Sequence, residues 1–334
     1  SVFVVFLNPD GSAKSHQSIG IGVGGFTGSL DQQDWFGYSV ASLGDLDGDG
    51  NSDIAVGAPL ADDGGTGNNQ RGVVWILFLD TNGMVKSHQL IGEGIGGFSG
   101  TLTTRDWFGT ALANIGDLDG DGVTDLAVGA INDDDGGTTV KEDRGAVWVL
   151  FMNSNGTVKN HVKISQTSGG FNGQLGPKEH FGAGITSPGD LNGDGVQDII
   201  VGAPDDDDGG RDRGALWALF MQTNGIVLSE QKMSSLVGMP SGASLGPKDR
   251  MGTALAPADD INEDGVPDIF VGICNNDDGL KDAGAVWLMY LTSAGTVLSV
   301  DKISSTHGNF HGQLDKKHCF GASVAALGDF DLDC

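Results

Sequence analysis

A short acidic segment recurs along the chain at a nearly constant spacing. It reads GDLDGDG at residues 116–122, and the aspartates that begin its copies are Asp45, Asp117, Asp190, Asp260 and Asp329. The spacings between them are 72, 73, 70 and 69 residues. A fixed period is typical of repeated supersecondary units that stack to bury their apolar faces. The repeat therefore limits the fold more than any single motif does.

Each repeat contains four predicted strands, as residues 106–164 illustrate. Residues 106–117 alternate between apolar and polar, whereas residues 125–130 and 146–152 are apolar almost throughout, which favours strands covered on both faces. Residues 157–164 alternate again after the turn NSNG, and Asn-Gly between two apolar strands is typical of a β-hairpin. No stretch shows a sustained helical period. We expect four antiparallel strands in each repeat.

Such units predict an all-β fold, a β-propeller whose four-stranded antiparallel blades stack around an axis. A linear stack of β units is the alternative. Four repeats are complete, at residues 36–107, 108–180, 181–250 and 251–319. A fifth is split, with two strands in residues 1–35, its first strand in residues 320–334, and one strand lacking. About five repeats are thus visible in a single domain or fragment, residues 1–334.

The split repeat leaves three arrangements open, because an unpaired sheet edge invites aggregation. In the first arrangement, the two ends of the chain pair in one blade and close a ring of five blades. Alternatively, the segment belongs to a longer natural chain. In the third arrangement a partner molecule fills the gap, and this head-to-tail contact builds filaments.

The composition of the chain limits the classes of partner that it can bind. The chain has 18 Lys and Arg against 45 Asp and Glu, a net charge of −27, which argues against binding to nucleic acid or to anionic membrane surfaces. No run of 18 apolar residues predicts a membrane span. The chain starts at Ser1 without a visible signal peptide, so we expect a mature or trimmed product. An odd count of cysteines, Cys274, Cys319 and Cys334, leaves at least one thiol free or paired elsewhere.

The acidic segments predict calcium sites. Their pattern is D-x-[D/N]-x-D-G-x-x-D, which aims several short carboxylates at one point, while glycine at position 6 permits a sharp turn. An EF-hand is excluded, because position 12 is Val128 rather than Glu and lies in a predicted strand. Mg²⁺ is disfavoured, since it keeps its waters and demands octahedral geometry. An ordinary solvated turn is the alternative for one loop, but the recurrence at fixed spacing favours structural Ca²⁺ in about four to five sites.

The predicted ligands in each of the first four loops are four aspartate or asparagine side chains and one backbone carbonyl, the carbonyl at position 7, and the fifth loop has three aspartates. In the fifth loop Cys334 stands where glycine is expected. The residues are Asp45, Asp47, Asp49, Asn51 and Asp53; Asp117, Asp119, Asp121, Val123 and Asp125; Asp190, Asn192, Asp194, Val196 and Asp198; Asp260, Asn262, Asp264, Val266 and Asp268; and Asp329, Asp331 and Asp333.

Two flanking motifs carry a resemblance to a known family. FG occurs at residues 36–37, 108–109, 181–182 and 320–321, and GAP at residues 57–59 and 202–204, with GAI at 129–131. With the acidic loop between them, nearly the whole chain resembles the FG-GAP repeat of the integrin α-subunit propeller, and it is similar to FG-GAP propellers of microbial surface proteins and fungal lectins. The fourth copy departs from the motif with Met251-Gly252 and Gly272-Ile273-Cys274.

The resemblance implies Ca²⁺ in the hairpin loops of an extracellular or cell-surface protein that acts in adhesion or recognition. We expect other proteins or copies of the same chain as partners, with a glycan-binding lectin as the alternative. We expect no enzyme, because cation binding accounts for the paired carboxylates and no nucleophile stands out. Asn155-Gly156-Thr157 is a candidate N-glycosylation site in a predicted turn, where Asn-Gly also serves as turn chemistry. A second acidic cluster before the third strand, at residues 62–63, 133–135, 205–208 and 277–278, is either a further cation site or a solvated loop.

Overall fold

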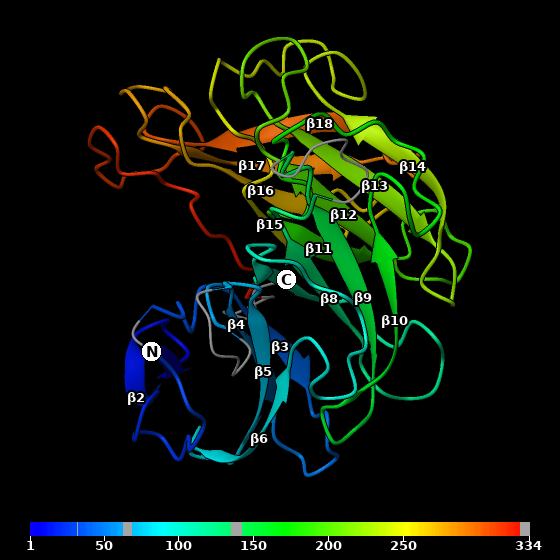
Figure 1. Ribbon diagram of the computed structural model, residues 1–334. Coiled ribbons are helices and arrows are strands. Elements are labelled where there is room, and N and C mark those ends of the chain that lie inside the picture. The colour runs from blue at the N-terminus through cyan, green and yellow to red at the C-terminus, as the bar shows by residue number, and fades with distance from the viewer. Residues whose placement is uncertain (32, 63–68, 135–141, 328–334) are drawn as a thin grey trace.

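The computed structural model describes residues 1–31, 33–62, 69–134 and 142–327 (Figure 1). Within these ranges the chain forms strands and no helix, so the all-β prediction is confirmed. Sixteen of the strands make four antiparallel sheets of four strands each, arranged in succession as the blades of a propeller.

Each blade follows the order of the chain, with neighbouring strands paired in sequence. Blade 1 contains β3 (Val40–Gly44), β4 (Asp53–Ala58), β5 (Val73–Leu79) and β6 (Val85–Ile91). Blade 2 contains β7 (Phe108–Asn114), β8 (Leu126–Ala130), β9 (Ala146–Met152) and β10 (Val158–Ile164). Blade 3 contains β11 (Ile185–Gly189), β12 (Asp198–Ala203), β13 (Ala215–Met221) and β14 (Val227–Met233). Blade 4 contains β15 (Ala254–Pro257), β16 (Ile269–Ile273), β17 (Ala285–Leu291) and β18 (Val297–Ile303).

The apolar third strands are buried because neighbouring blades cover them. Every residue of β5, β9 and β13 is buried. Ile76 and Phe78 of blade 1 belong to one core cluster with Trp148 and Leu150 of blade 2. The next two cores join blade 2 to blade 3 and blade 3 to blade 4 in the same way. The apolar pattern of these strands therefore specifies stacking between blades as well as pairing within them.

The FG and GAP motifs meet between blades. A Cβ atom on Gly129, the glycine of GAI, would clash with the carbonyl oxygen of Gly182, the glycine of FG in the next repeat. Gly57 meets Gly109, and Gly202 meets Gly252, in the same way. Only glycine allows two backbones to approach this closely. The two motifs thus form one contact that is repeated along the stack.

The segment between the fourth strand and the next repeat covers the tryptophan of the third strand. Phe98 meets Trp148 edge to face at 5.0 Å between ring centroids, and Phe171 meets Trp217 in the same geometry. The strand tryptophans are nearly fully buried, at 3–5% exposure. They are packing residues of the blades.

The two parts of the split repeat lie at opposite ends of the stack. Strands β1 (Val2–Leu7) and β2 (Ala13–Ile19) pair with each other in a two-stranded sheet, the N-terminal hairpin, which packs on blade 1 through Val2 and Ile19. Phe320 bridges to Gly284 of blade 4, the contact that Met251 makes with Gly214 one blade earlier and that Phe181 makes with Gly145 two blades earlier. Residues 320–327 contain no strand, and residues 328–334 lie outside the described part of the chain.

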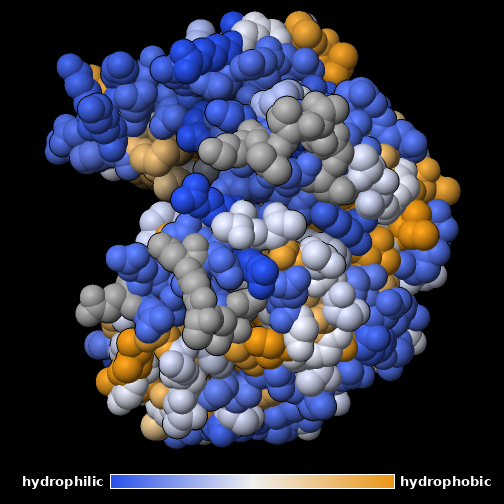
Figure 2. Space-filling view, viewed as in Figure 1, coloured by the Kyte–Doolittle hydropathy of each residue, from blue (hydrophilic) through white to orange (hydrophobic). Residues whose placement is uncertain are grey.

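The two ends of the stack are only partly covered. Phe3, Val5 and Leu7 of β1 are exposed, and alternate residues of β17 are half-buried, unlike those of β9. The molecular surface is hollowed between the side that carries blade 4 and the side that carries the N-terminal hairpin (Figure 2). At each end of the stack, the described residues include no second neighbouring blade of the kind that covers the third strands of the inner blades.

Candidate calcium-binding loops

Each acidic segment joins the first and second strands of a blade. We call residues 45–53, 117–125, 190–198 and 260–268 loops 1 to 4. In loop 2 the backbone N–H groups of Asp121 and Gly122 donate to the two carboxylate oxygens of Asp117 at 3.0 and 2.7 Å. The same pair of bonds closes the other three loops. The glycine at position 6 has φ of 88–89° in every loop, a left-handed conformation that favours glycine.

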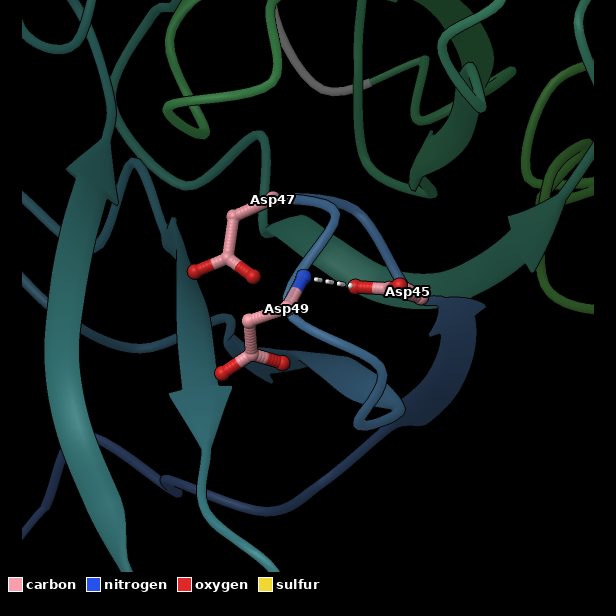
Figure 3. Close-up of side chains that lie close together, drawn as sticks. All are labelled: Asp45, Asp47 and Asp49. Atoms are coloured by element: carbon pink, nitrogen blue, oxygen red, sulfur yellow. Dashed lines mark hydrogen bonds between the residues drawn. The ribbon is translucent and has the colours of Figure 1, made fainter.

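This folding gathers carboxylates on one side of the loop. Asp45, Asp47 and Asp49 lie close together (Figure 3), and in loops 1 and 2 the three carboxylates approach within 4.8 Å of one another. Loops 3 and 4 have Asn192 and Asn262 at the third position. The donors are all oxygens, which is what Ca²⁺ prefers, so the residues fit a hard cation.

The aspartate at position 9 connects the loop to the sheet. Asp125 is fully buried, and its two oxygens accept N–H donors from Leu118 at 3.0 Å and from Met152 at 2.9 Å. Asp53, Asp198 and Asp268 make the same two bonds in their blades. Burial raises the pKa of Asp125 and of Asp198 to about 6. This residue therefore has a structural role whether or not it also binds an ion.

The residue at position 7 is held by its N–H group, which donates to the aspartate at position 5 at 2.9–3.0 Å in all four loops. Coordination through the carbonyls of Asn51, Val123, Val196 and Val266 stays a prediction. The three predicted ligands of the fifth loop, Asp329, Asp331 and Asp333, lie outside the described residues.

Sequence reasoning missed two lysines that contact the loops. Lys86 on β6 contacts Asp49 and lies 2.9 Å from Asp47 Oδ2, and Lys159 on β10 contacts Asp121 and lies 2.8 Å from Asp119 Oδ2. Hydrogen bonds to Asp49 and Asp47 raise the pKa of Lys86. The available signal was a lysine at the second residue of the fourth strand in the repeats that have aspartate at the third position of the loop.

The second acidic cluster forms ion pairs within its blade. Lys163 lies 2.9 Å from the buried Asp133, and Lys232 lies 2.7 Å from the buried Asp206. Both ammonium groups also lie over a strand tryptophan, at 5.4–5.5 Å from the ring centroid. A lysine thus pairs with a buried carboxylate of the cluster in each of blades 2 and 3. Asp63 and Asp135 lie outside the described residues.

A central cavity of about 880 Å³ is lined by Tyr38, Trp107, His180 and Arg250, among others. His180 Nδ1 and Arg250 both contact Asp205 Oδ2, at 2.6 and 2.7 Å. Trp107, His180 and Arg250 share one repeat position, directly before FG or, in the fourth copy, before Met251-Gly252, and have φ of 55–59°. One backbone geometry thus presents different side chains to the cavity.

Two further features concern covalent chemistry. Cys274, directly after β16, forms a disulfide with Cys319, the last residue of the fourth repeat, and Cys334 lies outside the described residues. Asn155 is exposed in the β9–β10 turn, where its side-chain oxygen accepts from Thr157 N at 3.1 Å and from Thr157 Oγ1 at 2.7 Å. Its glycosylation stays a prediction.

The arrangement defines a β-propeller with an acidic hairpin loop in each blade. The sequence matches the FG-GAP repeat at residues 36–77, 108–150, 182–219 and 251–289. Integrin alpha-PS2 of Drosophila melanogaster is 30% identical over 251 residues, which cover 75% of this chain and 16% of that protein. Integrin alpha-5 of Xenopus laevis is 36% identical over 51% of this chain and 15% of its own length. Integrin alpha-V of Gallus gallus is 30% identical over 71% of this chain and 20% of its own length.

The chain therefore carries four FG-GAP repeats and is related to integrin alpha subunits. It spans a fifth or less of the length of these relatives. Among solved structures, the rhamnogalacturonan lyase YesW is similar with a TM-score of 0.36 and 14% identity, over 82% of this chain and 49% of that chain. A likeness of this size bears on neither fold nor activity.

Proposed function

We propose that this chain is a calcium-binding β-propeller of an extracellular or cell-surface protein, and that it acts as an adhesion or scaffold module that contacts other proteins or copies of itself. The observation that carries the calcium proposal is the acidic loop, which has the same hydrogen bonds in all four blades. Relation to integrin alpha subunits supports the adhesion role.

Calcium has a structural role in this proposal. The loop joins two strands of each blade, and its aspartate at position 9 binds the third strand. Close carboxylates repel one another, and a divalent cation offsets this repulsion. An ion that binds the folded state and not the unfolded chain stabilises the fold by mass action, by about 2.7 kcal/mol per site at a hundred times the Kd.

Thermal unfolding tests the calcium role. We expect calcium to raise the melting temperature of the whole chain, chelator to reverse the rise, and magnesium at equal concentration to give less. Asp117→Asn combined with Asp121→Asn should reduce the rise, whereas Asp315→Asn, a highly exposed carboxylate outside the loops, should leave it unchanged. A melting temperature that does not respond to calcium or chelator would refute the proposal.

Two features support contact with proteins outside the cell. The Cys274–Cys319 disulfide is typical of an oxidising compartment. The exposed Phe3, Val5 and Leu7 of β1 offer an apolar strand to a partner, and a second copy would meet it head to tail. No helix in the described ranges is long and apolar enough to cross a membrane. Sedimentation at rising concentration should show association that Val5→Lys weakens, and a monomer at every concentration would exclude self-assembly.

Glycan binding is the second candidate function. Trp35 and Tyr38 are about half exposed and stack at 5.4 Å, and Tyr38 lines the central cavity with Trp107. Exposed aromatic rings of this kind can bind the apolar faces of sugars. A glycan array should then show sugar binding that Tyr38→Ala abolishes. We propose no catalytic activity, since cation binding accounts for the grouped carboxylates of the loops.

A further inference from the structure

The side chains at the third and fifth positions of each loop lie close together, and the four loops stabilise this arrangement in two ways. In loops 1 and 2 both positions are aspartates, and a lysine from the fourth strand of the same blade contacts both of them. Lys86 Nζ lies 2.9 Å from Asp47 Oδ2 and contacts Asp49 Oδ2. Lys159 repeats this arrangement in loop 2.

In loops 3 and 4 the donor comes from within the loop. The third position is asparagine, and Asn192 Nδ2 donates to Asp194 Oδ2 at 2.9 Å, while Asn262 Nδ2 donates to Asp264 Oδ2 at 3.0 Å. The residue at the place of the lysine is leucine, Leu228 on β14 and Leu298 on β18. The same carboxylate oxygen therefore accepts from an ammonium group in two blades and from an amide in the other two.

Counted over the predicted ligand side chains and the contacting lysine, the exchange keeps the charge constant. Loops 1 and 2 combine four aspartates with one lysine, and loops 3 and 4 have three aspartates and no lysine. A count of loop ligands alone predicts tighter calcium binding at loops 1 and 2, because affinity rises with ligand charge. The lysine offsets this difference in affinity, because its positive charge repels the ion. Its ammonium group also contacts two of the carboxylate oxygens available to the ion.

We infer that Lys86 and Lys159 are built-in competitors of calcium, which weaken binding at loops 1 and 2 and hold these loops together when calcium is scarce. The inference rests on the proposed calcium binding. Loops 3 and 4 lack this second cation and depend on calcium more strongly. The two pairs of blades therefore differ in their calcium dependence, although their loops have the same backbone hydrogen bonds.

A competing arrangement predicts the opposite sign. The lysine could stay on Oδ2 of both aspartates while the ion takes Oδ1, so that the ammonium group orients the ligands and helps binding. Removal of an orienting lysine weakens calcium binding, whereas removal of a competitor tightens it. The sign of the change in affinity thus separates the two roles.

Calcium titration by calorimetry tests the inference on the full chain. Lys86→Leu with Lys159→Leu gives loops 1 and 2 the leucine that the chain has at Leu228 and Leu298. We expect about half of the sites to bind calcium about tenfold tighter, because an ammonium group near a divalent ion is removed from a partly exposed site. The melting temperature in chelator should fall, because two carboxylates lose their shared partner. Lys86→Gln with Lys159→Gln should show the same direction with less loss of stability, and serves if leucine prevents folding.

Two controls complete the design. Lys281→Leu with Lys316→Leu changes the net charge equally at two exposed positions outside loops 1–4, and should leave affinity unchanged. Asn192→Asp should tighten loop 3 and destabilise it in chelator, and added Leu228→Lys should restore both values. Unchanged or weaker binding in the lysine variants, with calcium still bound by the wild type, overturns the competitor role alone. No calcium bound by the wild type overturns the proposed function as well.

Discussion

Strands β9 and β1 occupy the same place in their repeats and differ in burial. Every residue of β9 is buried, and Trp148 is 4% exposed, whereas alternate residues of β1 face solvent and Phe3, at the matching position, is 59% exposed. Their sequences, AVWVLFM and VFVVFL, are equally apolar. The neighbouring blade makes the difference, because β9 lies between two blades and β1 has one neighbour.

This comparison shows where the stability of the fold resides. In a stack of repeats each unit is stabilised mainly by contacts with its neighbours. A side chain between two blades therefore contributes more than the same type of side chain at the end of the stack. Three pairs of substitutions test how far this holds.

Truncation of the strand aromatic should give the largest contrast. Trp148→Ala is expected to lower the free energy of unfolding by about 3–5 kcal/mol, the usual cost of a large cavity in a core. Phe3→Ala is expected to cost less than about 1 kcal/mol, because the ring is already in water. Chemical denaturation measures both values. Equal losses would mean that β1 has a covering neighbour in solution.

The second contrast concerns carboxylates that bind backbone. Asp125→Ala leaves the buried N–H groups of Leu118 and Met152 without acceptors, and is expected to cost about 2–4 kcal/mol. Asp10→Ala removes an exposed acceptor in the turn of the N-terminal hairpin, and should cost much less. The unfolding of both variants is measured in the presence of chelator, so that ion binding does not contribute to the difference. A similar small loss for both would contradict the structural role of position 9.

The smallest effect is expected at the residue two places before FG. Burial, and then the nearby Asp206, raise the pKa of Glu179 to about 7, while the same repeat position beyond blade 4 holds the exposed His318. A carboxyl group with a raised pKa in the folded state stabilises the fold while it is protonated, and this contribution is lost as the pH rises through 7.

Glu179→Gln keeps the neutral form at every pH. At about pH 8 the free energy of unfolding of the variant should therefore exceed that of the wild type by roughly 1 kcal/mol, after allowance for solvent screening. Its melting temperature should be higher accordingly. The difference should shrink as the pH is lowered toward about 5. His318→Gln should show no such trend. A constant difference between Glu179→Gln and the wild type at all pH values would argue against burial of this charge.

Sequence reasoning recovered the parts of the molecule that depend on local pattern. The period, the Asn-Gly turns and the runs such as AVWVLFM predicted the blades, and the position 6 glycines predicted the curled loops. These features follow from backbone geometry and from burial, which a repeated sequence reports several times over.

The parts that sequence reasoning missed depend on register between distant segments. Lys86 reaches loop 1 from a strand 37 residues beyond Asp49, and only the sheet brings the two side chains together. The Cys274–Cys319 pairing and the raised pKa of Glu179 likewise arise from neighbouring segments in space. The sequence did contain a sign of the lysine contact. Lysine on the fourth strand occurs with aspartate at the third position of the loop, and leucine occurs with asparagine there.

Amide hydrogen exchange with and without calcium tests whether calcium at the acidic loops stabilises the blades. We expect slower exchange in calcium at loops 1 to 4 and at the backbone N–H groups bound by their position 9 aspartates, among them Met152 at the end of β9. We expect little change in the N-terminal hairpin, whose strands carry no such loop between them. Equal exchange in calcium and in chelator throughout the four loops would contradict a stabilising role of calcium.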